Sequence, residues 1–276
     1  METQSVVRRQ RLKLRTRRMV RRVLPFVASL FLATPLASPV TKSKAATTGS
    51  ELRLPVAAVT PAALFDQRLQ DLYRELALEQ QGLRFEVFQK AMTGYLNLES
   101  EGKLSDKQLL TIVDFGLPST QKRLWVLDLA TKQVKFHTLV AHGHNSGENM
   151  ATTFSNENES NMSSLGFYVT QGEYQGKHGR SLKLKGLDEG YNTNALSRSV
   201  VMHGADYVSE DFIRQYGRLG RSLGCPALPM AEKDAIIEAV EGQTCLFLNG
   251  PDERYSSKYL NQDVAVSKLL SETQMI

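Results

Sequence analysis

Residues 200–207 read VVMHGADY, and residues 217–229 read GRLGRSLGCPALP. The first segment places His203 at the end of a short apolar run, which predicts a buried strand. The second places Cys225 behind a turn at residues 222–224, whose glycine lets backbone N–H groups turn toward a developing oxyanion. A thiol reacts as its thiolate, and imidazole is the side chain that takes up a proton near neutral pH. The two segments therefore predict a Cys–His site for acyl transfer.

An inert cysteine is the main alternative, because a lone cysteine near a glycine is more often a small buried hydrophobe. The composition between His203 and Cys225 favours chemistry, since it combines backbone freedom with positive charge. The interval holds four glycines and three arginines, namely Gly204, Gly217, Gly220, Gly224, Arg214, Arg218 and Arg221. A strand of a hydrophobic core needs neither feature.

These residues resemble the active-site signature of the murein L,D-transpeptidases of the YkuD type, cysteine enzymes with His-Gly, a spacer and then Ser/Thr-His-Gly-Cys. They resemble more closely the L,D-transpeptidase catalytic domain branch, with His-Gly-Ala-Asp-Tyr and Gly-Arg-Ser-x-Gly-Cys-Pro-Ala. The resemblance covers about residues 108–249 and includes Val-Ala-His-Gly at 140–143 and Ser-Ser-Leu-Gly-Phe-Tyr at 163–168. Two features depart from the broader pattern: Leu223 stands where that family has His, and the spacer before Ser222 is slightly longer.

The resemblance implies a mainly β (α+β) fold, with a β-sandwich catalytic domain behind a short N-terminal helical extension. It implies that Cys225 attacks a carbonyl of a peptidoglycan stem peptide, that His203 is the base, and that the Gly204 carbonyl orients the ring. The oxyanion hole would comprise the amides of Gly224, Cys225 and Leu223. Substrate contacts would come from Arg221, Ser222, Tyr174 and His142, and Asn192 and Arg198 could also meet a peptide carboxylate. No metal or organic cofactor is required.

The acceptor of the acyl group stays open. An amine of a second stem peptide would make a cross-link, water would make the enzyme an L,D-carboxypeptidase, and a lysine would anchor an envelope protein. A cysteine endopeptidase is a further enzymatic alternative, and a non-catalytic wall-binding envelope protein is the alternative of another class. A catalytic Cys225 is expected to alkylate with a pH profile shifted below that of a free thiol.

The second cysteine and the other histidines allow further interpretations. Cys245 lies in an apolar run that predicts a buried strand, so we expect a free thiol, with a Cys225–Cys245 disulfide as the alternative. His142 and His144, with His137 and His178, offer an alternative metal site. Zinc needs three or four converging ligands, and no His-Glu-x-x-His or paired cysteines accompany them.

The charge of the chain is unevenly distributed. Its net charge is +5, yet residues 1–45 hold eleven Lys/Arg and one acid, and the remainder is mildly acidic, which disfavours a nucleic-acid partner. The basic block precedes an apolar run at 23–33 and a segment of small residues, the layout of a secretory signal. We expect export to the periplasm or cell envelope, with membrane association only if this segment stays uncleaved.

The rest of the chain divides by composition and period. We expect a signal and the start of a linker at 1–45, a linker at 46–60, a helical extension at 61–105, a catalytic domain at 106–250 and a polar, peripheral tail at 251–276. Helical spacing from Pro61 to about Gln80 and again after Gly82 predicts two packed helices. Short strands are predicted at 110–115, 122–129, 133–140, 166–170, 181–185, 199–203 and 244–249, with a late helix at 230–241.

Overall fold

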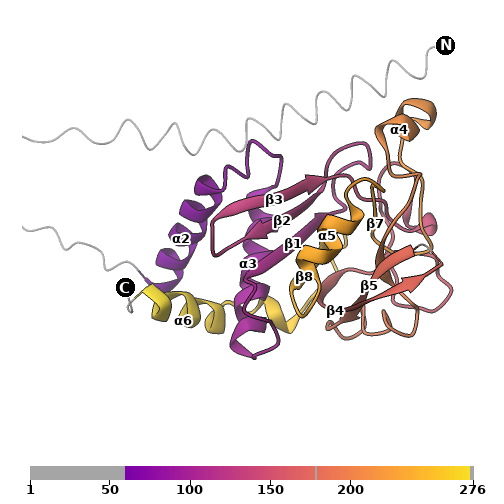
Figure 1. Cartoon of the computed structure of the whole chain (residues 1–276). Helices are drawn as coiled ribbons and strands as arrows, with labels where there is room; N and C mark the ends of the chain where they lie inside the picture. The colour runs from indigo at the N-terminus through magenta and orange to yellow at the C-terminus, as the bar shows by residue number, and fades with distance from the viewer. Residues whose placement is uncertain (1–59, 178, 274–276) are drawn as a thin grey trace, which may run out of the picture. The chain divides into compact units, whose positions relative to one another are not determined.

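The computed structural model describes residues 60–177 and 179–273. Eight strands form one mixed sheet in the order β3-β2-β1-β8-β4-β5-β6-β7 (Figure 1). The strands are β1 (Leu109–Asp114), β2 (Leu124–Asp128), β3 (Gln133–Thr138), β4 (Gly166–Gly176), β5 (Gly179–Gly186), β6 (Val201–Gly204), β7 (Ala227–Leu228) and β8 (Cys245–Asn249). The predicted sheet-dominated α+β class is confirmed.

The sheet nearly closes on itself. The chain that leaves β3 continues to Ala141, which bridges antiparallel to Ala227 in β7, the strand at the opposite edge of the order. Gly143 then makes a parallel bridge to Ser222, just upstream of the same strand. Closure of this kind leaves fewer unpaired strand edges. It also brings residues 141–143 against the segment that leads to Cys225.

Helices cover one face of the sheet. They are α2 (Pro61–Glu75), α3 (Phe85–Ser100) and α6 (Gln262–Thr273), while α4 (Glu210–Tyr216) and α5 (Lys233–Val240) lie on other parts of the fold, with single 3-10 turns at η1 (His144–Ser146) and η2 (Lys258–Leu260). The two predicted N-terminal helices are present. The Thr60 hydroxyl accepts from the Ala63 amide at 3.2 Å and Pro61 begins the helix, which is the capping that the sequence predicts.

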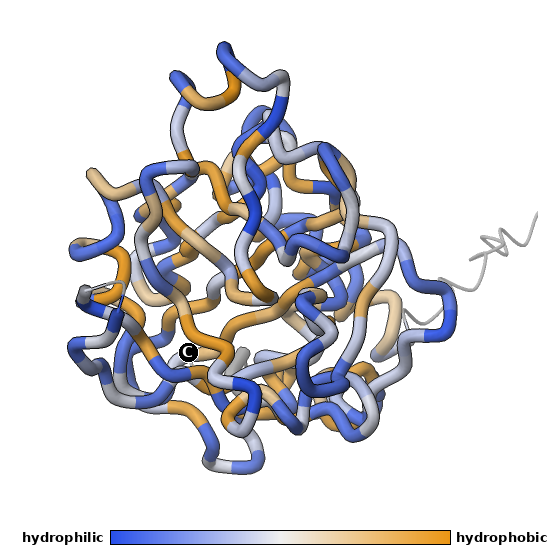
Figure 2. Tube along the Cα trace, turned by 90° about the vertical axis from the view of Figure 1, so that its right-hand side faces the viewer, coloured by the Kyte–Doolittle hydropathy of each residue, from blue (hydrophilic) through white to orange (hydrophobic). Residues whose placement is uncertain are grey.

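The central strands are buried on both faces. In β8, Phe247 packs toward the helices, where its ring lies 4.4 Å from that of Phe167, while Leu246 and Leu248 join a second core on the other face. Gly94 lets α3 lie directly on this layer, because a methyl group there would overlap the Phe167 ring. The helices therefore share one core with the sheet. Figure 2 shows the hydrophobic segments concentrated in the interior and the hydrophilic ones at the peripheral turns.

Two parts of the fold differ from the sequence prediction. The segment after Asn249 is not peripheral, since Tyr259 is buried and Ala265 of α6 reaches the helix-side core. The short helix α4 was not predicted, because none of its residues is buried and it shows no apolar face. Its ends are nonetheless well specified, with the Ser209 hydroxyl accepting from the Phe212 amide and Gly217 closing the helix in a left-handed conformation. Among the described residues, no helix has the length and apolar character needed to span a bilayer.

Candidate active site

His203 lies on β6, between β5 and β7. It pairs with Ser181 of β5 and with Ala227 of β7, and its side chain is buried. Its Nδ1 lies 2.9 Å from the Gly204 carbonyl oxygen, and because a carbonyl only accepts, Nδ1 carries the proton. Nε2 is then the nitrogen that can take up a proton. The predicted orienting contact from Gly204 is present.

Cys225 approaches β6 from the side of β7. Its sulfur accepts from the Val201 amide at 3.4 Å and donates to the Ser199 carbonyl at 3.7 Å. Because Val201 and His203 are two positions apart on one strand, they are separated by about 7 Å and face the same side. The fold therefore brings the predicted nucleophile and the predicted base to the same part of β6.

The thiol of Cys225 has a raised pKa. Burial is the largest cause, and it is opposed by the Val201 amide and by the positive charge of Arg198. The resting group is thus a neutral thiol at neutral pH, which reverses the sequence-based expectation of a depressed thiol pKa. Because the resting thiol is protonated, a base must remove its proton when the sulfur attacks a carbonyl. Cys245 is a separate free thiol, buried in β8, so no disulfide joins the two.

The turn before Cys225 is built by Ser222 and Gly224. The Ser222 hydroxyl donates to the Cys225 carbonyl at 2.6 Å and accepts from the Gly224 amide at 3.1 Å. Gly224 has φ +122°, and a Cβ there would lie 2.7 Å from the Met162 carbonyl oxygen, so only glycine fits. Within the residues that the structure describes, the amides of Leu223 and Cys225 have no acceptor.

The predicted oxyanion donors are therefore not equivalent. The Gly224 amide is engaged by Ser222, whereas those of Leu223 and Cys225 remain available to an incoming oxygen. The Leu223 side chain is 74% exposed beside them. The Ser222 hydroxyl stabilises the turn through its two hydrogen bonds to backbone groups.

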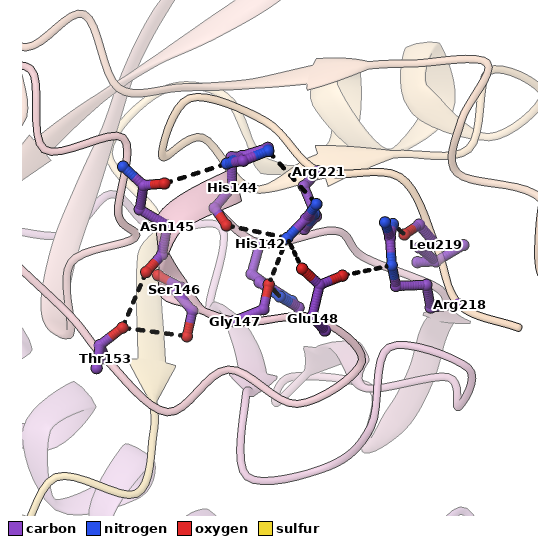
Figure 3. A network of polar contacts seen from close by, with 10 residues as sticks. All are labelled: His142, His144, Asn145, Ser146, Gly147, Glu148, Thr153, Arg218, Leu219 and Arg221. Atoms are coloured by element: carbon purple, nitrogen blue, oxygen red, sulfur yellow. Dashed lines mark hydrogen bonds and ion pairs between the residues drawn. The ribbon is translucent and has the colours of Figure 1, made fainter. Parts of the chain in front are cut away.

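The Arg221 guanidinium is bound by other groups of the protein. Its Nη1 donates to the carbonyls of His144 and Gly147 and pairs with the Glu148 carboxylate at 2.8 Å (Figure 3). Glu148 also pairs with Arg218 at 2.9 Å. These contacts hold the 144–148 loop against the segment before Cys225. They engage the guanidinium of Arg221, for which the sequence predicts a substrate contact.

His142 is a second correction. It has no exposed surface, its Nδ1 accepts from Arg123 at 2.7 Å, and its Nε2 donates to the Gly147 carbonyl at 3.3 Å. Burial, then the Arg123 charge, lowers its pKa to about 4, so the ring is neutral. Its backbone carbonyl accepts from the Ser222 amide at 3.0 Å. His142 therefore supports the turn from its buried side, and its ring has no exposed surface with which to contact a substrate.

Tyr174 lies in line with the candidate base. The register of three strand pairs sets Tyr174 opposite Ser181, Ser181 opposite His203, and His203 opposite Ala227. Directly paired residues share a face of the sheet, so Tyr174 and His203 are about 10 Å apart on one side. With 37% of its surface exposed, Tyr174 can meet a substrate that crosses β5.

Arg198 and Ser199 are the residues whose place was least evident from the sequence. The sequence offers Arg198 as one of several possible carboxylate partners and indicates no role for Ser199. Ser199 adopts φ +54°, a left-handed conformation that is uncommon for a residue other than glycine. This conformation aims its carbonyl at the Cys225 sulfur, and no local sequence pattern announces it.

The remaining polar candidates are structural. The Asn192 amide is buried and donates to the carbonyls of Leu165 and Phe167. His137 stacks on Trp125 with ring centroids 5.0 Å apart. In residues 60–177 and 179–273 no group of three His, Cys, Asp or Glu side chains is placed to hold a metal ion, and His178 lies outside those ranges.

Comparison with known proteins places these features in context. The family model described as L,D-transpeptidase catalytic domain matches residues 79–249. No curated protein matches the chain. The match begins within the helical region upstream of β1 and ends with β8, so it includes both His203 and Cys225.

Solved structures resemble the chain only distantly. An L,D-transpeptidase from Mycobacterium smegmatis is 12% identical with a TM-score of 0.32, covering 51% of this chain and 58% of that one. A mutant of the helical cell shape determining protein Pgp2 from Campylobacter jejuni is 13% identical with a TM-score of 0.33, covering 67% and 64%. An L,D-transpeptidase fragment from Xylanimonas cellulosilytica is 14% identical with a TM-score of 0.31, covering 77% and 100%.

Proposed function

The chain belongs to the L,D-transpeptidase catalytic domain family, and from that membership we propose that it is a cysteine acyltransferase of the cell wall. Its donor would be a tetrapeptide stem of peptidoglycan, and its product a remodelled or cross-linked stem. The basic and apolar segment at residues 1–33 supports an exported location, where this substrate is found.

The observation that carries the proposal is the arrangement around β6. The Gly204 carbonyl holds the proton of His203 on Nδ1, so Nε2 is the nitrogen that can take up a proton. The Val201 amide, on the same strand, contacts the Cys225 sulfur. A thiol, an oriented imidazole and two available amides are the parts that acyl transfer through a thioester needs.

In the first half-reaction, the Cys225 sulfur attacks the carbonyl carbon of the L-centre that precedes the terminal D-alanine. The thiol proton passes to His203 Nε2, and an S–C bond forms. When the tetrahedral intermediate collapses, the C–N bond to D-alanine breaks and His203 returns the proton to the departing amine. The result is a thioester on Cys225 and free D-alanine.

In the second half-reaction, an acceptor amine attacks the thioester carbonyl. His203 removes the amine proton, the new C–N bond forms, and the S–C bond breaks to regenerate the thiol. The amides of Leu223 and Cys225 would hold the oxyanion in both halves. One such donor is typically worth about 2.7–4 kcal/mol of transition-state stabilisation.

The test is release of D-alanine from a disaccharide-tetrapeptide by the full chain. We expect release by the wild type and by Cys245→Ala, and none by Cys225→Ala, because only Cys225 lies beside β6. We expect His203→Gln to lose roughly 10²–10⁴-fold in rate, the range of general base catalysis. Equal release by wild type and Cys225→Ala would refute the proposal.

The products distinguish the acceptors. A dimer in which the acyl carbonyl of one stem forms an amide with an amine of a second stem indicates transpeptidation, a tripeptide indicates hydrolysis, and a peptide-modified lysine indicates anchoring of a protein. Cleavage within a stem or cross-bridge without loss of D-alanine indicates an endopeptidase. Absence of all of these, with tight binding to the wall fragment, indicates a binding protein.

A further inference from the structure

Arg198 is held over the turn that carries the nucleophile. Its Nη1 donates to the Ser155 carbonyl at 2.7 Å, and its Nη2 donates to the Ser160 hydroxyl at 3.0 Å and to the Met162 carbonyl at 2.7 Å. The same Nη2 lies 3.2 Å from the position that a Cβ on Gly224 would occupy. Three neutral acceptors thus fix a guanidinium directly above the residue before Cys225.

The charge of Arg198 is not neutralised by a direct ion pair. In the described part of the chain, no carboxylate lies within 4.0 Å of its nitrogens. Arginine stays protonated even when partly buried. A half-buried cation that lacks a direct ion pair carries a desolvation cost.

We propose that Arg198 supplies the positive charge that stabilises the anionic sulfur of Cys225 when the thiol is deprotonated. The inference rests on the proposed function for its meaning in catalysis, but the reactivity of the thiol tests it without any substrate. Arg198 does not touch the reacting carbon; it acts through its electric field on the sulfur.

The contacts of the sulfur explain why such a charge is needed. The Ser199 carbonyl accepts from the thiol and repels a thiolate, and burial opposes the anion as well. The Val201 amide is the one neutral donor to the sulfur among the described residues. The Ser199 carbonyl and burial raise the free energy of the thiolate, and the positive charge of Arg198 lowers it.

Other titratable groups face this pair from the surrounding segments. His203 lies on the adjoining part of β6, and Tyr207, which follows β6, has its pKa raised to about 12 by burial and then by Cys225. Glu157 of the 155–162 loop and Tyr168 of β4 interact electrostatically with Arg198. Since both tyrosines stay neutral below pH 10, Arg198 is the group in this set with a permanent positive charge.

The experiment measures the rate of alkylation of Cys225 by iodoacetamide between about pH 6 and 10, in a Cys245→Ala background, so that one thiol reports. Arg198→Gln keeps hydrogen-bonding capacity and removes the charge; Arg198→Lys keeps the charge. We expect the profile of Arg198→Gln to move upward by about one pH unit, which is roughly a tenfold lower rate at pH 7. Arg198→Lys should stay within about threefold of the parent, which is about half of a decade and less than the tenfold loss expected of Arg198→Gln.

A second pair of variants controls for the loop that Arg198 holds. Ser160→Asp places a carboxylate beside Nη2 and neutralises the charge without removing the arginine, whereas Ser160→Asn changes the same contact without charge. We expect Ser160→Asp to shift the profile upward and Ser160→Asn to leave it in place. This pair decides the matter if Arg198→Gln does not fold.

Each outcome has a definite meaning. Upward shifts confined to Arg198→Gln and Ser160→Asp support the proposal. An unshifted profile in both, or equal shifts in Ser160→Asp and Ser160→Asn, overturns it, because the arginine would then act only as a clamp on the loop. If the shifts appear but no variant or parent releases D-alanine, the charge is confirmed and the proposed function fails separately.

Discussion

Replacing Gly224 with alanine should abolish most activity while leaving the fold in place. The new Cβ would lie 2.7 Å from the Met162 carbonyl oxygen, where ordinary contact begins at 3.4 Å. The turn must therefore move by about 0.7 Å, and a displacement of about 1 Å of reacting groups can cost 10²-fold in rate. Since the amides of Leu223 and Cys225 flank this residue, they are displaced together.

The backbone adds a cost in stability. At φ +122° an alanine is strained by roughly 1–3 kcal/mol. In a domain of this size a loss of 1 kcal/mol lowers Tm by about 2–4 °C. We therefore expect Gly224→Ala to unfold several degrees lower, yet to be folded at 25 °C.

Gly217→Ala is the matched control. Gly217 also has a positive φ, +72°, but nothing lies within 4 Å of its Cβ position, and it ends α4 away from the nucleophile. We expect a comparable loss of Tm and unchanged release of D-alanine. The kinetic assay is kcat/KM for D-alanine release beside a thermal melt of each variant. If Gly224→Ala keeps more than about a third of the Gly217→Ala activity, the geometric reasoning about the turn is wrong, because a 0.7 Å shift should cost far more.

Three further outcomes follow from burial and charge. The alkylation rate of wild-type Cys225 should keep rising above pH 9.0, because burial raises the thiol pKa, and a plateau below about pH 8 would contradict this. The pKa of His142 is lowered to about 4, so the stability that depends on its neutral ring is fully present above pH 6.5 and is lost toward pH 4. The loss is about 3 kcal/mol, and urea titrations should show a weaker pH dependence of the free energy of unfolding in His142→Gln than in the wild type. Arg84→Met removes three hydrogen bonds, two of 3.0 Å and one of 2.9 Å, from the fully buried Asp114 carboxylate. Chemical denaturation should show a loss of about 3 kcal/mol, and a loss under about 1 kcal/mol would refute this expectation.

The sequence locates the elements that carry His203 and Cys225. A histidine after an apolar run and a cysteine after a glycine turn are local patterns, and β6 and the 222–225 turn place them as the patterns indicate. The predicted strands and N-terminal helices also occur, because each carries its own period or cap. Local signals thus account for the sheet and for the pair His203 and Cys225.

What the sequence does not predict depends on long-range contacts. Arg198 reaches the 155–162 loop about 40 positions upstream, and nothing near it in the chain indicates that its charge lies over Gly224. The glycine that follows His142 is typical of a histidine in a cleft, but the closure of the sheet buries the ring beneath Ser222. Helix α6 has a weakly apolar face, and its place is determined by the core that α2 and α3 present to it.

The most direct test of the central claim is the intact mass of the full chain after brief incubation with a disaccharide-tetrapeptide. Acyl transfer predicts a covalent adduct equal to the donor minus D-alanine, located on Cys225 by peptide mapping, lost on treatment with hydroxylamine and absent from Cys225→Ala. A folded protein with a free Cys225 that releases no D-alanine and forms no adduct would contradict the account, and an adduct on Cys245 or another residue would do so equally.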